Sequence, residues 1–427
     1  MLAAEQQRLE ALIDWEKRSR GAPSGTQGSG MRVTVEPARD LLARLDHPEQ
    51  GLRVVHVAGT KGKGSVAALV AGSLEFEGLR TGVFASPHVE RINERIRIGG
   101  VEIEDDELAV VLKAALDAQE SALAEGTAAR DASWFDVLTT AAVLAFRRAE
   151  VDWAIVECGL GGRLDSTNAL SGEICVVTNI DLEHTDVLGE TLAEIAAEKA
   201  GILDAGATLV TSVCEATEAG AVIAARAKSL GVPIVRPNLE GLSILEENAE
   251  LARCVLAELS QRGVRGAGGK TLDGSINESV LKAARLPGRL ELRELDGVRV
   301  ILDGAHVASS LERVLGDLEH AELLSGSPLV CILGVGKDKQ LEALLKVLVG
   351  RVDRLVCTSV GMGPVRSPRE IQEVATGLRL AAETAVGPRG ALLRALELAS
   401  PDGLVLVTGS LHLIGAVRPL LLPTDTC

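Results

Sequence analysis

The sequence predicts an α/β protein made of two domains, and two patterns carry this prediction. Short runs rich in β-branched residues alternate with longer helical patterns, which is typical of βαβ units and of a mostly parallel sheet. The alternation starts afresh after Leu286-Pro287-Gly288-Arg289, where a Pro-Gly pair interrupts a helical stretch. At 427 residues, with 46% hydrophobic and 24% charged residues, the chain is long enough for two packed cores.

The first domain is predicted to span residues 1–285 and the second, smaller one residues 286–427. Each is expected to hold a sheet flanked by helices. The strands predicted for the first domain are Val54–Ala58, Thr81–Ala85, Trp153–Glu157, Ile174–Asn179 and Thr208–Ser212. Those predicted for the second are Arg299–Asp303, Leu329–Leu333, Arg354–Thr358 and Leu404–Thr408. Met1–Arg20 has a helical character, Gly21–Gly30 is expected to be a mobile loop, and Arg262–Ser275 is a glycine-rich loop.

Charge and composition exclude several classes of partner. The formal net charge is -16 and no run of Lys and Arg forms a basic stripe, which argues against nucleic acid and anionic membranes. Apolar stretches such as Val137–Phe146 are too short to cross a bilayer, and the first residues lack the order of a signal peptide, so a cytoplasmic protein is expected. Seven cysteines without a CxxC pair predict buried reduced thiols, as at Cys175, Cys331 and Cys357.

A phosphate-binding loop is the clearest motif. Gly59-Thr60-Lys61-Gly62-Lys63-Gly64-Ser65 lies between a predicted strand and a helix predicted over Ser65–Glu75. Free N–H groups and the helix dipole attract phosphate at such a place, and Lys63, expected in an exposed loop, adds a positive charge. Gly64 departs from the general pattern G-x-x-x-x-G-K-[ST]. The alternative, a plain βα turn, would have little use for two lysines, so we expect ATP to bind here.

Further polar residues follow predicted strands and so gather at the carboxyl edge of each sheet. Glu157 ends one strand and is placed to hold Mg²⁺, and the glycine-rich loop Gly159–Asn168 follows it. His184 comes after the next strand; a lone histidine is more often structural than a ligand. Lys199 lies on a helix predicted over Thr191–Ala200, where ion pairs with Glu194 and Glu198 are the simplest interpretation. In the second domain Asp303 and His306 close a strand, which suggests a ligand held between domains.

Taken together, these motifs resemble one enzyme family in sequence and in order. The resemblance is to folylpolyglutamate synthase/dihydrofolate synthase and runs from about Glu36 to Arg418. Gly64, Ser86-Pro87-His88 and Asn93-Glu94-Arg95 distinguish that family from the Mur ligases, its structural relatives. The other motifs that carry it are Glu157–Asn168, Thr178-Asn179-Ile180, Glu198-Lys199-Ala200-Gly201-Ile202 and Asp303-Gly304-Ala305-His306.

The resemblance implies an N-terminal P-loop-type domain, a C-terminal Rossmann-like domain, and an ATP-dependent amide ligase. A folate or dihydropteroate carboxylate would take the γ-phosphoryl group of ATP, and L-glutamate would displace phosphate from the acyl phosphate. ATP and Mg²⁺ are the implied cofactors, and a monomer is the implied state. In this resemblance Lys63, His184 and Lys199 are catalytic, and Lys199 corresponds to a lysine that becomes carbamylated. The implied Mg²⁺ ligands are Ser86, Glu157, His184 and, once carbamylated, Lys199. Nucleotide contacts are implied for Gly59–Ser65, Asn248, Arg289 and Asp303, and glutamate contacts for His306 and Ser410.

The chain departs from the family pattern at three places. Val307-Ala308-Ser309-Ser310 replaces the Asn-Pro that usually follows Asp-Gly-Ala-His in bacterial members, the stretch from Pro233 to Asn248 is short and lacks a glutamine before Asn248, and the segment before Glu36 matches poorly. Two alternatives therefore stay open. One is a Mur-type ligase for a different acid and amino acid. The other is a non-catalytic ATP-binding regulator, against which the retention of Glu157, His184 and Lys199 argues.

Overall fold

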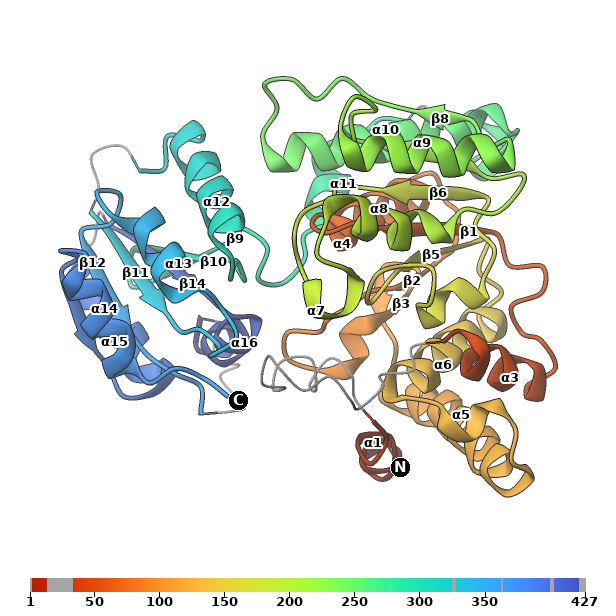
Figure 1. The fold of residues 1–427 in the computed structure, drawn as a ribbon, viewed down its shortest axis with the longest axis horizontal. Coiled ribbons are helices and arrows are strands. Elements are labelled where there is room, and N and C mark those ends of the chain that lie inside the picture. Colours follow the sequence, from red (N-terminus) through yellow and green to blue (C-terminus); the bar gives the residue numbers. More distant parts are fainter. Residues whose placement is uncertain are drawn as a thin grey trace. The chain divides into compact units, whose positions relative to one another are not determined.

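The computed structural model describes most of the chain as two compact units, one ending at Ala284 and one beginning at Arg285 (Figure 1). The predicted mobile loop Gly21–Gly30 lies outside the described residues. Within the part that is described, no helix is long and apolar enough to cross a membrane. The described residues are 2–13, 34–272, 274–324, 328–361, 364–399 and 403–421.

The first unit is built on an eight-stranded sheet with the order β4-β3-β2-β5-β1-β6-β7-β8. Strands β2, β5, β1, β6, β7 and β8 are parallel, and β3 and β4 extend one edge in antiparallel pairing. Val57 on β1 lies between Glu157 on β5 and Val176 on β6, so these strands end at one edge. The strands are β1 Val54–Ala58, β2 Thr81–Phe84, β3 Ile96–Ile98, β4 Val101–Glu102, β5 Trp153–Glu157, β6 Ile174–Val177, β7 Thr208–Thr211 and β8 Ile234–Val235.

Helices cover both faces of this sheet, which explains why every residue of β1 and β5 is buried. One core cluster joins the sheet to α3, α5 and α6, and another joins it to α8 and α9. Helices α4 and α10 pack on each other and on further strands. The helices are α1 Leu2–Glu10, α3 Glu36–Arg44, α4 Lys63–Phe76, α5 Asp105–Glu125, α6 Trp134–Arg148, α7 Thr185–Leu188, α8 Leu192–Lys199, α9 Glu218–Leu230, α10 Ile244–Gln261 and α11 Glu278–Ala283.

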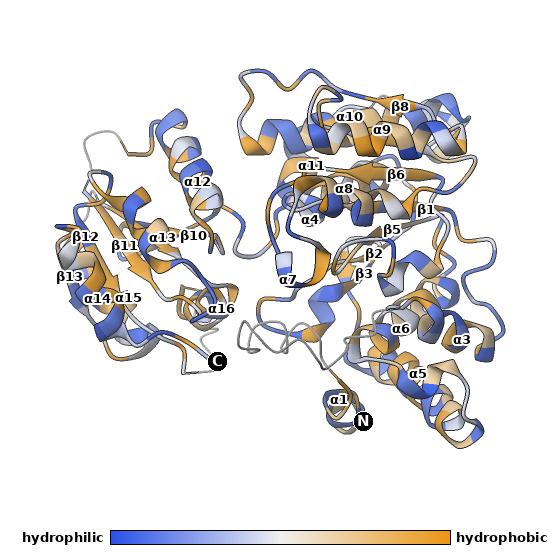
Figure 2. Cartoon of the chain, viewed as in Figure 1, coloured by the Kyte–Doolittle hydropathy of each residue, from blue (hydrophilic) through white to orange (hydrophobic). Residues whose placement is uncertain are grey.

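The second unit holds a six-stranded sheet with the order β13-β12-β11-β14-β10-β9. All neighbours are parallel except β9, which pairs antiparallel with β10. Figure 2 shows β11 in the colour of hydrophobic residues, in keeping with its burial along its whole length. The strands are β9 Glu291–Leu295, β10 Val298–Leu302, β11 Leu329–Leu333, β12 Arg354–Cys357, β13 Ala382–Thr384 and β14 Leu404–Thr408. The helices are α12 Ala308–His320, α13 Leu341–Leu348, α14 Pro368–Gly377, α15 Gly387–Ala399 and α16 Leu411–Val417.

The predicted fold class is confirmed, and the predicted buried strands are all present. Those at 54–58, 153–157, 329–333 and 404–408 have the predicted bounds, and the others differ by one or two residues. Strands β3, β4, β8, β9 and β13 were not predicted. Four of these are short, and β4, β8, β9 and β13 lie at or next to a sheet edge where a strand needs fewer apolar residues. Cys175, Cys331 and Cys357 are free and buried, as predicted.

Candidate active site

The phosphate loop joins the buried strand β1 to helix α4 by a path that requires glycine. Gly59 has φ 140° and Gly62 has φ 81°, both in the left-handed region. A Cβ on Gly59 would lie 1.9 Å from Thr178 Oγ1, and one on Gly62 would lie 2.4 Å from Asn248 Oδ1. Gly62 is the N-cap, so α4 begins at Lys63, two residues earlier than predicted. The loop therefore presents the N–H groups of a helix N-terminus, which is a natural anion site.

The segment after β6 holds this loop in place. Thr60 N donates to Asn179 O at 2.9 Å, and Lys61 N donates to Asn179 Oδ1 at 2.8 Å. The hydroxyl of Thr178 donates to Lys61 O at 2.6 Å. Lys61 Nζ also forms an ion pair with Glu183 Oε1 at 2.7 Å. Backbone and side chains of this segment thus fix the loop before any nucleotide arrives.

Lys63, Glu157 and Ser86 lie together at the carboxyl edge. Lys63 Nζ donates to Gly59 O at 3.1 Å and lies 4.0 Å from Glu157 Oε1. The buried Glu157 accepts a hydrogen bond from Ser86 N at 3.0 Å through Oε2. The Lys63 side chain is 17% exposed, so the expectation of an exposed loop position is wrong, because Lys63 opens α4 and folds back over the loop carbonyls.

Lys199 is buried at the end of α8 and reaches the same loop. Its Nζ donates to Gly59 O at 2.8 Å. Burial, followed by the charge of Lys63, lowers the pKa of the Lys199 amine from 10.5 to about 7. The simple interpretation as a helix ion pair is wrong, because Glu198 pairs with Arg163 at 2.7 Å and Glu194 caps its own helix at Thr191.

The glycine-rich loop after β5 packs against the end of α8 that carries Lys199. A Cβ on Gly162 would lie 2.8 Å from Glu198 O, so only glycine allows this approach. The buried Asp165 carboxylate accepts from Leu160 N at 2.8 Å and from the Thr167 hydroxyl at 2.5 Å. These bonds hold the loop in shape beside Glu157 and Lys199.

His184 occupies a different environment from the other predicted metal ligands. It is the exposed N-cap of α7 with φ 53°, and it follows Glu183, which pairs with Lys61. No group of three His, Cys, Asp or Glu side chains in the described part of the chain is arranged to hold a metal. Mg²⁺ in nucleotide sites takes one or two protein carboxylates and completes its shell with phosphate oxygens and water. Glu157 beside the phosphate loop fits that kind of site.

In the second unit the predicted residues lie at the ends of the neighbouring strands β10 and β14. Asp303 is buried, and its carboxylate accepts from Leu290 N and Ala305 N, both at 2.9 Å. Burial raises the pKa of Asp303, and Arg289 opposes that shift. His306 Nδ1 lies 2.9 Å from Gly304 O. Ser410 is the N-cap of α16 and accepts from His412 N at 3.1 Å.

Comparison with known proteins identifies the family to which this chain belongs. Residues 288–411 match the family described as Mur ligase, glutamate ligase domain. The dihydrofolate synthase/folylpolyglutamate synthase of Bacillus subtilis is 32% identical over 351 residues, which are 75% of this chain and 79% of that protein. This chain belongs to the folylpolyglutamate synthase/dihydrofolate synthase family. The predicted resemblance is therefore confirmed.

Solved structures of this synthase family share the fold. A Mycobacterium tuberculosis folylpolyglutamate synthase complexed with ADP matches with a TM-score of 0.79 and 27% identity, covering 100% of both chains. A bifunctional synthase from Yersinia pestis, complexed with AMPPNP and a manganese ion, matches with a TM-score of 0.78 and 26% identity, covering 98% of both chains.

Lys337 was not among the predicted residues and follows a strand of the second unit that neighbours β14. It is exposed in the segment after β11, where its N donates to Pro364 O at 2.8 Å. Strand β11 is the neighbour of β14, and a Cβ on Gly409 would lie 2.8 Å from Gly334 O. The segment that carries Lys337 thus begins beside Gly409, the residue before Ser410. In the sequence, Lys337 could have been noticed from the run Gly334-Val335-Gly336-Lys337, a glycine-rich segment with a lysine after a buried strand.

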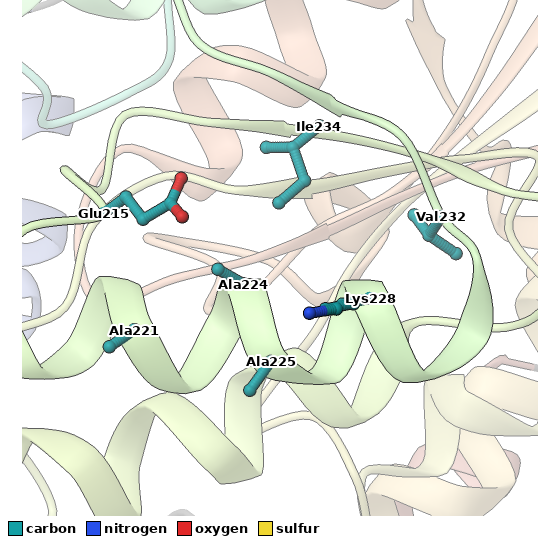
Figure 3. A pocket seen from close by; sticks show the side chains of 7 residues that line it. All are labelled: Glu215, Ala221, Ala224, Ala225, Lys228, Val232 and Ile234. Atoms are coloured by element: carbon teal, nitrogen blue, oxygen red, sulfur yellow. The ribbon is translucent and has the colours of Figure 1, made fainter.

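A surface hollow of about 490 Å³ lies between α9 and the edge strand β8 (Figure 3). Alanines of α9 form much of its wall, with the exposed Glu215 and Lys228 beside them. None of its lining residues belongs to the candidate site, and none is a buried polar group. This hollow is therefore not part of the candidate active site.

Proposed function

We propose that this synthase is an ATP-dependent ligase that joins the amino group of L-glutamate to a carboxylate of folate or dihydropteroate, releasing ADP and phosphate. The observation that carries the proposal is the cluster formed by Lys63, Ser86, Glu157 and Lys199 around the Gly59 loop. It combines an anion-binding helix N-terminus, two lysines and a buried carboxylate. Phosphoryl transfer needs this combination of positioning and charge neutralisation.

The reaction proceeds through an acyl phosphate. The carboxylate oxygen of the pterin substrate forms a bond to the γ-phosphorus, and the bond from that phosphorus to the bridging oxygen of ADP breaks. The amine of glutamate then attacks the acyl carbon, loses a proton, and phosphate leaves. Lys63 and the loop N–H groups stabilise the charge on the phosphates. Mg²⁺ would be held by Ser86, Glu157 and His184, and would neutralise charge on the phosphate oxygens.

Lys199 is suited to carbamylation. Only a neutral amine attacks CO₂, and a pKa of about 7 leaves a large neutral fraction at physiological pH. The product is a carbamate anion, formed as the amine nitrogen bonds to carbon and releases a proton. Lys63 and Lys61 lower the pKa of this amine, and the same positive charges favour the carbamate. The carbamylated Lys199 would then offer oxygen atoms to the metal.

Residues 1–285 are assigned the phosphate loop and most of the ATP contacts. Residues 286–427, which include the region matched to the glutamate ligase domain, are assigned glutamate binding and two further nucleotide contacts. Nucleotide contacts are proposed for Gly59–Ser65, Asn248, Arg289 and Asp303. Asn248 supports this because its side chain lies against Gly62. His306 and Ser410 are proposed to bind glutamate, and Lys337 is added because both substrates are anionic.

The test is ADP release from purified protein in the presence of Mg²⁺. Release is expected only when a folate or pteroate and L-glutamate are both present, and mass spectrometry of the products from dihydropteroate and from tetrahydrofolate separates the two synthase activities. ATP turnover that is indifferent to every pterin would overturn the proposal. Turnover with another acid and amino acid would instead support the Mur-type alternative, and tight ATP binding without turnover would support a regulator. A monomer working in the cytoplasm stays a prediction.

A further inference from the structure

The turn that presents Arg289 has an unfavourable backbone conformation. Gly288 has φ 64° and Leu290 has φ 46°, so left-handed residues stand on both sides of Arg289. For leucine this conformation is uncommon and costs free energy. Such a turn persists only when its surroundings fix it. Leu290 N donates to Asp303 Oδ2 at 2.9 Å, and Gly304 N donates to Gly288 O at 3.0 Å.

A third bond to this turn comes from Glu291, the first residue of β9. Gly288 N donates to Glu291 Oε2 at 2.9 Å. The same carboxylate accepts from Arg293 Nε at 2.8 Å and from Arg418 Nε at 3.0 Å. Burial by itself would raise the pKa of Glu291, but the Gly288 N–H and the two arginines outweigh it and lower that pKa. Glu291 is therefore a partly buried, ionised carboxylate whose two oxygens accept hydrogen bonds from the turn and from both arginines.

Arg418 connects this carboxylate to a second element. It is the C-cap of α16, the helix that Ser410 begins. Helix α16 also packs directly on the turn, because a Cβ on Gly288 would lie 2.8 Å from Ile414 Cγ2. The turn and the helix are thus linked through the carboxylate of Glu291, which accepts hydrogen bonds from both. Arg289 itself is exposed, and its Nη1 lies 3.6 Å from where a Cβ of Gly304 would be, so the guanidinium extends over the Asp303–His306 segment.

We propose that Glu291 is a positioning residue for Arg289: it fixes the Gly288–Leu290 turn and, through Arg418, couples that turn to the helix begun by Ser410. This inference rests on the proposed function, in which Arg289 contacts the nucleotide. Because Arg289 is exposed, its direction depends on the turn beneath it. Loosening the turn misplaces the guanidinium without removing it, and small misplacements of a substrate-contacting group are costly.

The test is a double-mutant cycle on kcat/KM for ATP in the full chain. Glu291→Gln keeps the shape of the side chain and removes its charge, and is expected to lower kcat/KM by about 10- to 100-fold. Arg289→Ala is expected to lower it at least as much. When Arg289 is already alanine, adding Glu291→Gln should cost less than about twofold more, because the residue it positions is gone. Glu294→Gln, the same change at an exposed position of the same strand, should leave kcat/KM unaltered.

If the losses in kcat/KM of the two single variants multiply in the double variant, the inference is overturned. Glu291 would then be a general structural residue. An inactive wild-type enzyme would instead overturn the proposed function, so the two failures are distinguishable. If Glu291→Gln does not fold, Glu291→Asp goes through the same cycle, since it keeps the charge beside the arginines and is one methylene shorter. A loss with Glu291→Asp that disappears in the Arg289→Ala background supports the inference, and a loss that persists there overturns it.

Discussion

Replacing Lys199 by methionine is expected to stabilise the first unit at neutral pH. In the folded protein the pKa of this amine is lowered from 10.5 to about 7. Between these two values the unfolded chain binds a proton that the folded chain does not, so stability rises with pH across this window. The free-energy cost of burying the lysine is fully present below about pH 7. It disappears as the pH approaches 10.5, the pKa of the free amine. Methionine fills similar space and removes this cost.

The magnitude follows from the pKa shift. At roughly 1.36 kcal/mol per pKa unit, the cost is about 4 kcal/mol at pH 7 and about 2 kcal/mol at pH 9. The variant also loses the hydrogen bond from Lys199 Nζ to Gly59 O, worth about 1 kcal/mol, but Lys63 still donates to that carbonyl. Lys199→Met should therefore be more stable than wild type by about 3 kcal/mol at pH 7 and about 1 kcal/mol at pH 9.

Urea unfolding followed by tryptophan fluorescence measures this difference. Trp134 and Trp153 are both buried in the first unit, so their signal reports on the unfolding of that unit. Both proteins are compared in buffers freed of CO₂, which keeps Lys199 as an amine. Lys228→Met, at an exposed lysine of the same unit, is the matched control. Its difference in unfolding free energy from the wild type should not change with pH. A stability difference that stays constant from pH 7 to pH 9, or a less stable Lys199→Met variant, would refute the reasoning.

Four further outcomes are expected. Lys63→Ala should lower kcat by about 100-fold or more while circular dichroism stays that of the wild type, since the hydrogen bonds of its Nζ go to loop carbonyls; a mild loss would argue against a role of Lys63 in the reaction. Gly59→Ala should abolish ADP binding in calorimetry, because its Cβ would lie 1.9 Å from Thr178 Oγ1; retained affinity would contradict the loop geometry. Activity should fall in CO₂-free buffer and return with bicarbonate, with a carbamate signal from ¹³C-bicarbonate that Lys199→Met lacks; activity indifferent to CO₂ would argue against carbamylation. Lys337→Ala should raise KM for glutamate about tenfold or more with KM for ATP unaltered, and an unaltered KM for glutamate would exclude it from that site.

The sequence predicted those features that depend on neighbouring residues. A buried strand, glycines and a helix start make up the phosphate loop, and all of them lie within a short stretch. Glu157 could be placed beside it because parallel strands end at one edge. The environment of Lys199 could not be predicted, since Lys199 and Gly59 are 140 positions apart in the sequence. Only the fold shows that this lysine is buried against the loop.

Other features were missed for specific physical reasons. The antiparallel strand β9 has the sequence ELREL, in which burial alternates but polarity does not, since Leu292 lies on the exposed side with Glu294. Asp296-Gly297 before β10 was nevertheless a hairpin signal. Asp303 was predicted to contact nucleotide, yet its carboxylate already accepts two backbone N–H groups. Its contact with nucleotide stays a prediction, and its visible role is to shape the turns around it.

The pairing of β1 with both β5 and β6 has a consequence for protein synthesis. The loop sequence leaves the ribosome early, but its partner Asn179 is 118 positions later and Lys199 later still. Contacts this distant in sequence form slowly, and a chain made from its N-terminus cannot form them until the later segment exists. A nascent chain that ends before β6 would carry the whole loop motif and still lack Asn179 and Lys199, which hold the loop in shape. Nucleotide affinity would thus report that synthesis has passed β6 and α8, and ATP would stabilise only chains that have passed that point.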